Sequence, residues 1–141
     1  MKLMFTETTI EDRTEIVVFS GNRQIGSLSM EILFDSCSSY EFEDVFTEDE
    51  INKIYPLFEI VKMEHVQIDD EYKNLGIGSK LMKRAIKLMR DNGYSQFYLN
   101  ASPMGSTGLR VNELVEFYRK FGFKPLVNMG HNVLMGVVFQ Q

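Results

Sequence analysis

The sequence predicts a single α/β domain, residues 1–141, with a mixed and largely antiparallel sheet flanked by helices. Three observations lead to this fold class. The N-terminal part has strand-like runs on either side of a Gly-Asn turn, as hairpins do. A strand pattern then passes through a Gly-x-Gly turn into an amphipathic helix. A second strand and helix follow, then two short strands, with no repeat or linker that would mark a second domain.

The first elements expected are the strands of a hairpin. Residues 15–19 are rich in β-branched side chains, and residues 24–34 continue with partial alternation of apolar and polar residues. Gly21-Asn22 supplies the turn between them. A short strand over residues 3–8 is expected to precede this hairpin.

The next segment, residues 35–46, is polar and acidic and is expected to be a loop. Thr47-Glu48-Asp49-Glu50 has the pattern of a capping box, which predicts a short helix to about Tyr55 that ends before Pro56. Residues 57–68 then predict a long strand, because apolar residues recur along it.

The longest helix is expected over residues 77–91. Its apolar residues recur at helical spacing, and they are Leu81, Met82, Ala85, Ile86 and Met89. The basic residues Lys80, Lys83, Arg84, Lys87 and Arg90 fall away from that stripe. Asn92-Gly93 is a suitable stop, because glycine readily adopts the left-handed conformation that ends helices.

The C-terminal part predicts a strand, a helix and two strands. The strand covers residues 96–100, and a Ser/Pro/Gly-rich loop over residues 101–108 separates it from a helix over residues 111–121. Two final strands, over residues 123–127 and 133–139, surround a turn that contains Gly130.

Composition excludes several classes of protein. The chain is 44% hydrophobic and 25% charged, and it has neither a membrane-length apolar run nor a signal-peptide core. The single Cys37 cannot form an internal disulfide and fits a reducing cytoplasm, and the two histidines lie too far apart for a zinc cluster. The net charge of -5 disfavours nonspecific nucleic-acid binding. We therefore expect a cytoplasmic protein without a metal, a membrane or a nucleic acid as partner.

Charge is distributed unevenly along the chain. Residues 24–52 hold acidic residues and no Lys or Arg, whereas residues 73–90 hold basic residues and no Asp or Glu. The first segment would repel anions and the second would attract them. Within the first segment, the acidic residues 35–52 are expected either to favour a cationic substrate at an entrance or to serve as a solubilising loop.

Gly76-Ile77-Gly78 is the motif with most chemical content. It joins a strand to a basic helix, so its free amides and the positive end of the helix dipole would form a cradle for a phosphate group. A dinucleotide fingerprint would need Gly or Ala where Leu81 stands, and a nucleoside-triphosphatase loop would need a different ending after Gly78. A plain tight turn between strand and helix is the alternative interpretation.

Two stretches together resemble the GNAT family of N-acetyltransferases. The strand ending in Val66-Gln67-Ile68, the loop to Leu75 and the Gly-x-Gly turn resemble the family's motif A. Further on, the stretch from Leu114 to Phe123, with its tyrosine and its Gly-Phe ending, resembles the family's second signature. The resemblance covers about residues 57–139 and implies the family's acyl-CoA N-acyltransferase fold.

The resemblance also implies how a donor substrate would bind. In this family the corresponding loop holds the pyrophosphate of acetyl-CoA, which gives this role to the amides of Asn74, Leu75, Gly76, Ile77, Gly78 and Ser79. Main-chain groups of Val66 and Ile68 would bind the pantetheine arm. Lys73 stands where the family usually has Arg or Gln, and it keeps the positive charge without the fork of arginine.

Catalytic roles are implied in the same way. Tyr118 matches the tyrosine that acts in many members as general acid toward the departing thiolate, although its spacing alone would fit a core residue on an amphipathic helix. Glu64 is the first choice for the general base, because it shares a strand face with Val66 and Ile68. His65 and Glu59 are the alternatives. An amide near Val66 would hold the acetyl oxyanion.

The expected function is transfer of an acetyl group from acetyl-CoA to a primary amine by direct attack in a ternary complex. The acceptor would be a small-molecule or protein amine, with a cationic amine as one option, and a homodimer is left open. Family members usually carry two helices after the first strand, and this chain has no room for them before the hairpin. The alternatives are an acyl-CoA-binding sensor or partner-binding module without turnover, and a structural protein that uses the fold for assembly.

Overall fold

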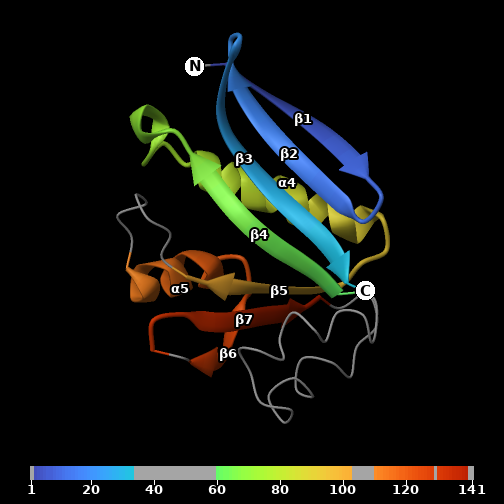
Figure 1. Cartoon of the computed structure of the whole chain (residues 1–141), viewed down its shortest axis with the longest axis vertical. Coiled ribbons are helices and arrows are strands. Elements are labelled where there is room, and N and C mark those ends of the chain that lie inside the picture. The colour runs from blue at the N-terminus through green and yellow to red at the C-terminus, as the bar shows by residue number, and fades with distance from the viewer. Residues whose placement is uncertain (1, 34–59, 103–109, 129, 140–141) are drawn as a thin grey trace. The chain divides into compact units, whose positions relative to one another are not determined.

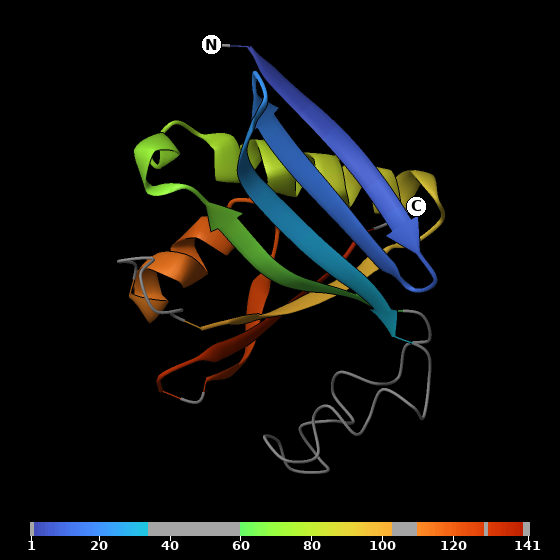
Figure 2. The same ribbon diagram turned by 45° about the horizontal axis from the view of Figure 1, so that its top comes forward.

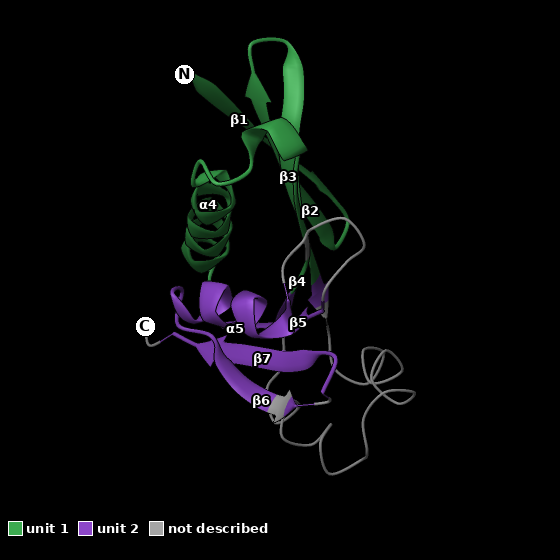
Figure 3. Cartoon of the chain, turned by 90° about the vertical axis from the view of Figure 1, so that its left-hand side faces the viewer, with its two compact units in different colours: residues 1–31, 63–94 green, residues 32–62, 95–141 purple. Residues whose placement is uncertain are grey.

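The computed structural model describes residues 2–33, 60–102, 110–128 and 130–139. The chain forms two compact units, each assembled from separate segments of the sequence. The first unit contains residues 1–31 and 63–94, and the second contains residues 32–62 and 95–141 (Figure 3). The loop expected at residues 35–46 and the helix expected at residues 47–55 lie outside the described residues.

The first unit contains strands and one long helix. Its elements are β1 (Leu3–Ile10), β2 (Arg13–Ser20), β3 (Arg23–Leu33), β4 (Ile60–Ile68, assigned to this unit from Met63), the short 3-10 helix η1 (Asp70–Tyr72) and α4 (Ile77–Asp91). The strand order is β1-β2-β3-β4, and β2 runs antiparallel to both β1 and β3. The helix α4 contacts β2 and lies across one face of these strands (Figures 1 and 2).

The expected hairpin is confirmed, with its turn at Gly21-Asn22. The strand before it is longer than expected, because it pairs along its whole length with β2. The turn between those two strands places Glu11 at a φ of 55°, in the left-handed region. Glycine is the usual residue there, and its absence removed the sequence signal for this turn.

The core of the first unit lies between α4 and the strands. Five α4 side chains are buried, and they are Ile77, Leu81, Met82, Ala85 and Met89. Strand residues of the same unit, such as Ile16, Val18, Leu28 and Met30, are buried as well. The predicted apolar stripe is therefore confirmed, apart from Ile86, which is only half-buried. All five predicted basic residues of α4 are exposed.

The end of α4 follows the predicted stop. Gly93 has a φ of 94°, its amide donates to the carbonyl of Arg90, and the amide of Tyr94 donates to the carbonyl of Met89. This pair of hydrogen bonds is a Schellman motif, in which a left-handed glycine satisfies the last carbonyls of a helix.

The second unit contains β5 (Gln96–Ala101), α5 (Val111–Arg119), β6 (Lys124–Asn128) and β7 (Val133–Val138). The strand order is β5-β7-β6, and both pairings are antiparallel. The helix α5 contacts all of these strands. Phe97, Leu99, Phe123, Leu134 and Met135 are almost fully buried and form the core of this unit.

The elements of the second unit occur in the predicted order, with small differences at their ends. The helix was expected to reach Phe121 but ends at Arg119. The amide of Phe121 donates to the carbonyl of Tyr118, and the amide of Gly122 donates to that of Arg119, so the last turn tightens. Gly122 then turns the chain with a φ of 97°. The turn at Gly130 is confirmed, with a φ of 89°.

Candidate functional site

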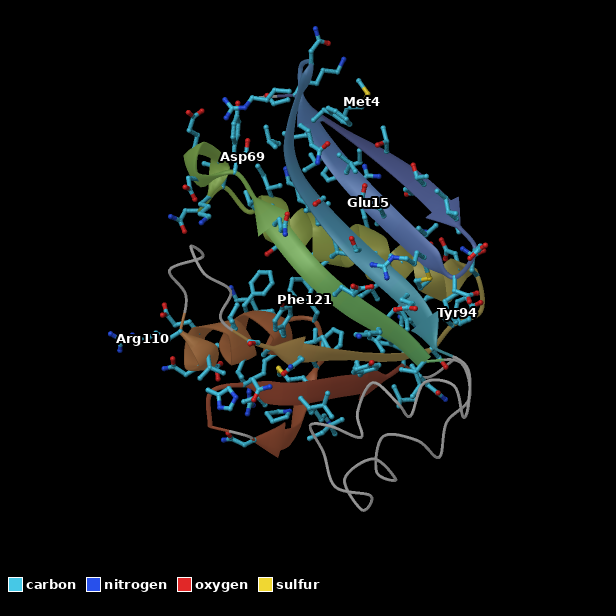
Figure 4. All side chains as sticks on the ribbon, viewed as in Figure 1. Met4, Glu15, Asp69, Tyr94, Arg110 and Phe121 are labelled. Carbon is cyan, nitrogen blue, oxygen red and sulfur yellow. The ribbon has the colours of Figure 1, made fainter. Side chains whose placement is uncertain are left out.

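The junction between β4 and α4 has an unusual backbone path. The strand β4 ends at Ile68, Asp69 follows it in Figure 4, and the chain passes through η1 before α4 begins at Ile77. Two residues in the intervening turn have left-handed backbones, Asn74 with a φ of 65° and Gly76 with a φ of 77°. Asn and Gly are the residues that adopt this conformation most readily, which explains why they stand here.

The amides of this turn are available for a ligand. Gly76 is the N-cap of α4 and offers no side chain to cap the helix, and the first α4 bond donated at this end runs from the amide of Lys80 to the carbonyl of Gly76. Among the described residues, no main-chain carbonyl accepts a hydrogen bond from the amides of residues 74–79. These amides begin a helix of 15 residues, whose dipole adds partial positive charge. The arrangement can hold an anion.

Charged side chains around the turn affect how strongly the amides of residues 74–79 would attract an anion. The first turn of α4 carries no acidic residue, and Lys80 is exposed beside it. The ammonium of Lys73, however, lies 2.7 Å from the Oδ1 atom of Asp70. Lys73 is thus already paired with a carboxylate, so its charge offers an incoming anion less than a free lysine would.

The side chains of β4 divide between two faces. Val61 and Met63 are buried, whereas Glu64, Val66 and Ile68 are half-buried and alternate with them. The expected shared face of Glu64, Val66 and Ile68 is therefore present, because alternate residues of a strand point the same way.

Glu64 has a charge partner that sequence reasoning missed. Its Oε1 atom lies 2.7 Å from the Nη2 atom of Arg13, and its side chain is only 17% exposed. Arg13 also reaches Glu31, with 3.6 Å between Nη1 and Oε2. Arg13 stands opposite Glu31 in the β2–β3 register, and nothing in the sequence indicated that register.

Tyr118 belongs to the second unit and is buried on α5. Only 9% of the residue is exposed, and its ring makes edge-to-face contacts with Phe117 and Phe123, at centroid distances of 5.2 and 6.3 Å. Burial raises the pKa of the Tyr118 phenol above its ordinary value, because the charged phenolate would lose its hydration. The phenol carries its proton at neutral pH, as an ordinary tyrosine does, and burial makes it a weaker acid.

The structure thus brings most of the predicted residues together in the first unit. These are Glu64, Val66, Ile68 and the run from Lys73 to Ser79. Tyr118 lies in the second unit. Of the alternative bases, His65 is on β4 with its side chain outside the described set, and Glu59 lies outside the described residues.

Comparison with known proteins identifies the family of this chain. Residues 12–125 match the family model described as the acetyltransferase (GNAT) domain, whereas a search of curated proteins found no match. The chain belongs to the GNAT acetyltransferase domain family. The expected fold, a mixed and mostly antiparallel sheet flanked by helices, is confirmed, and the family is one of acyltransferases.

Solved structures with the same fold include three from different sources. PaiA N-acetyltransferase from Thermoplasma acidophilum, in complex with coenzyme A, is 20% identical with a TM-score of 0.61, and the match covers 91% of this chain and 62% of that one. Naa50 from Arabidopsis thaliana, in complex with the bisubstrate analogue CoA-Ac-MVNAL, is 13% identical with a TM-score of 0.59. The match covers 89% of this chain and 72% of that one. FeeM, an N-acyl amino acid synthase from uncultured soil microbes, is 11% identical with a TM-score of 0.67. The match covers 90% of this chain and 67% of that one.

Among the described residues, no helix is both long enough and apolar enough to cross a membrane, and no three His, Cys, Asp or Glu side chains form a group suited to a metal ion.

Proposed function

We propose that this protein is an N-acetyltransferase that moves an acetyl group from acetyl-CoA to a primary amine in a ternary complex. The observation that carries the proposal is the set of free amides at the β4–α4 junction. They precede a helix with no acidic residue in its first turn, in a chain that belongs to the GNAT family. Such amides suit a diphosphate, which is one of the anionic groups of acetyl-CoA.

The donor would bind along β4 and the turn that follows. The amides of residues 74–79 would hold the diphosphate, and main-chain groups of Val66 and Ile68 would bind the pantetheine arm. The ammonium of Lys73 is paired with the carboxylate of Asp70 at 2.7 Å. Lys73 would therefore contribute to diphosphate binding only after it leaves Asp70 and pairs with a phosphate oxygen. Coenzyme A in the PaiA structure and the bisubstrate analogue in the Naa50 structure support this choice of donor.

The reaction takes two protons from the acceptor nitrogen and gives one to sulfur. The acceptor ammonium first loses a proton, for which Glu64 is the proposed base, directly or through water. The amine nitrogen then attacks the thioester carbonyl, a C–N bond forms, and an amide near Val66 would stabilise the resulting oxyanion. As the C–S bond breaks, Tyr118 would give its proton to the departing thiolate, and the second proton released by the nitrogen would restore the phenol. The phenol is protonated at neutral pH, as an ordinary tyrosine is, and its raised pKa means that it gives up the proton only to a strong base such as the departing thiolate.

The acceptor is proposed as a small-molecule or protein amine. Glu31 and Glu64 share the single guanidinium of Arg13, so this group carries an excess of negative charge. That excess favours a cationic amine as acceptor. We place the protein in the cytoplasm and leave a homodimer open as its assembly.

A second candidate is an acyl-CoA-binding module without turnover. The observation that favours it is the Arg13–Glu64 ion pair, because the proposed base is already engaged by a guanidinium at 2.7 Å. Such a module would bind acetyl-CoA through the same amides and would release no coenzyme A when amines are added.

One assay separates these functions. Free thiol is measured while acetyl-CoA is mixed with a panel of amines, such as polyamines, amino acids and lysine-containing peptides. An acetyltransferase releases coenzyme A in step with an acetylated amine detected by mass spectrometry. Binding of acetyl-CoA without amine-dependent thiol release would favour the module, and no binding at millimolar acetyl-CoA would reject both.

A further inference from the structure

Residues 69–72 lie just before the free amides of residues 74–79, and a residue of the β2–β3 hairpin contacts them. Arg23 follows the Gly21-Asn22 turn and opens β3. Its Nη1 atom lies 3.0 Å from the Oε2 atom of Glu71, and its Nη2 atom lies 3.3 Å from the Oδ2 atom of Asp69. The guanidinium also lies over the ring of Tyr72, 5.7 Å from its centroid. One side chain therefore contacts three residues of the segment that leads into the donor loop.

The main chain holds the same segment close to the hairpin. The amide of Asp69 donates to the carbonyl of Ile25 at 2.8 Å. Beside it, Gly26 packs so closely that an added Cβ would lie 2.8 Å from the Ile68 Cδ1 atom and 3.0 Å from the Gln67 carbonyl oxygen. The backbone bond fixes where the segment starts, and the Arg23 side chain fixes the direction of η1 after it.

We propose that Arg23 is a positioning residue for the donor site, through its contacts with Asp69, Glu71 and Tyr72. It orients the segment that ends at Tyr72, two residues before the first cradle amide at Asn74. This inference rests on the proposed function, because it assigns a role at the same donor site. Preorganised amides bind an anion more tightly, since less order has to be imposed when the ligand arrives.

Charge alone does not account for the role of Arg23. Its single positive charge faces two carboxylates, so the cluster as a whole is negative and offers no net attraction to a diphosphate. The charge of Glu71 and its hydrogen bond raise the pKa of Arg23, and the guanidinium is charged at every working pH, as arginine is in any case. Arg23 therefore acts on donor binding through geometry.

The test measures coenzyme A affinity by isothermal titration calorimetry on the full chain. The variants are Arg23→Gln, Arg23→Lys and Glu71→Gln. Arg23→Gln is expected to weaken binding about three- to tenfold, the range expected when exposed ion pairs and a cation–π contact are lost. Arg23→Lys should restore part of the affinity, because a lysine keeps the charge but reaches one carboxylate at a time.

Glu71→Gln separates geometry from charge. Removing a negative charge near an anion site would strengthen binding if only long-range charge mattered. If Arg23 acts by positioning the segment, loss of its contact with Glu71 should weaken coenzyme A binding instead. The effect should be only about twofold, because Arg23 keeps Asp69 as a partner. Lys87→Gln is the matched control. It removes the same charge as Arg23→Gln and breaks an exposed ion pair, with Asp91 at 2.6 Å, near the far end of α4. It should leave the affinity unchanged.

Kinetics give a readout that a general loss of stability would not reproduce. With acetyl-CoA as donor, Arg23→Gln should raise KM and leave kcat close to that of the parent protein. With S-acetylpantetheine, which lacks the diphosphate, both constants should stay unchanged. Circular dichroism should show the same thermal unfolding for the Arg23→Gln and Lys87→Gln variants, within a few degrees.

Two results would overturn the proposal while the proposed function stands. One is unchanged coenzyme A affinity in Arg23→Gln, and the other is tighter binding in Glu71→Gln. If the parent protein binds coenzyme A with no measurable affinity, the proposed function itself fails. The parent titration therefore distinguishes the two failures.

Discussion

At the scale of single residues, the burial of Tyr118 decides what its phenol is able to do. Burial raises the pKa of Tyr118, so the folded protein holds the proton to a higher pH than the unfolded chain does. Above about pH 10, where an unfolded tyrosine ionises, the unfolded state therefore gains stability relative to the folded one. The stabilising contribution of this site is complete below that pH and is lost as the pH rises through the folded pKa.

The Tyr118→Phe variant tests both consequences. It removes the only proton that the ring could donate and keeps the ring's contacts with Phe117 and Phe123. We expect kcat to fall about 10²-fold or more, as for a positioned acid, with little change in coenzyme A affinity. Thermal melts from pH 8 to pH 11 should show a smaller loss of stability at alkaline pH than in the parent. Full activity in the variant would contradict the role of Tyr118 as general acid and would mean that Tyr118 only packs in the core.

Glu64 is tested against a neighbour with the same charge partner. Glu64→Gln should lower the acetylation rate strongly, because the acceptor ammonium then lacks its base. Glu31→Gln is the matched control, since Glu31 also reaches Arg13 and its loss changes the net charge equally. Rates are measured as thiol release under saturating acetyl-CoA. Equal losses in the two variants would mean that the charge of the group, and not a base at Glu64, matters.

At the scale of elements, the donor loop depends on two left-handed residues. Gly76→Ala places a Cβ in open space, so its cost is conformational, about 1–2 kcal/mol. Asn74→Ala should cost a similar free energy of unfolding, whereas Asn74→Gly should be neutral, because glycine adopts this conformation without strain. Denaturant unfolding and coenzyme A titration are the measurements. Weakened coenzyme A binding in Asn74→Gly, at unchanged stability, would show that the asparagine side chain contacts the ligand.

The packing of β3 against β4 gives a second prediction at this scale. Gly26→Ala would bring a Cβ to 2.8 Å from the Ile68 Cδ1 atom and to 3.0 Å from both the Gln67 carbonyl oxygen and the Val18 Cγ1 atom. Because one of these contacts is backbone, the strands must shift, and we expect a loss of about 1–3 kcal/mol in the free energy of unfolding. Ser27→Ala, one residue along the strand, should change it by less than about 0.5 kcal/mol. Equal stability of the two variants would contradict this packing.

Elements with a periodic pattern were predictable from the sequence. The stripe and the Gly93 stop of α4 are local signals, and the structure follows both. The turn at Glu11 was not predictable, because no glycine marks its left-handed residue. The end of α5 was misplaced by two residues, because its final tightened turn keeps an apolar residue, Phe121, beyond the helix.

At the scale of the whole molecule, the candidate site divides into a predictable and an unpredictable part. Motif spacing indicated the donor loop and its free amides, because they lie within one continuous stretch of sequence. The Arg13–Glu64 and Arg23–Glu71 ion pairs were missed, since each joins β2 or β3 to a residue more than forty positions away. Long-range register decides such pairs, and one sequence carries no signal for it.

The central claim is that the amides between β4 and α4 bind the diphosphate of acetyl-CoA. The most direct measurement is an amide-resolved NMR titration of the ¹⁵N-labelled chain with coenzyme A, and then with pantetheine as the form without phosphate. The account predicts that coenzyme A causes its largest amide shifts at residues 74–79, and that pantetheine leaves those amides unchanged. Saturation by coenzyme A with no change at residues 74–79 would contradict it.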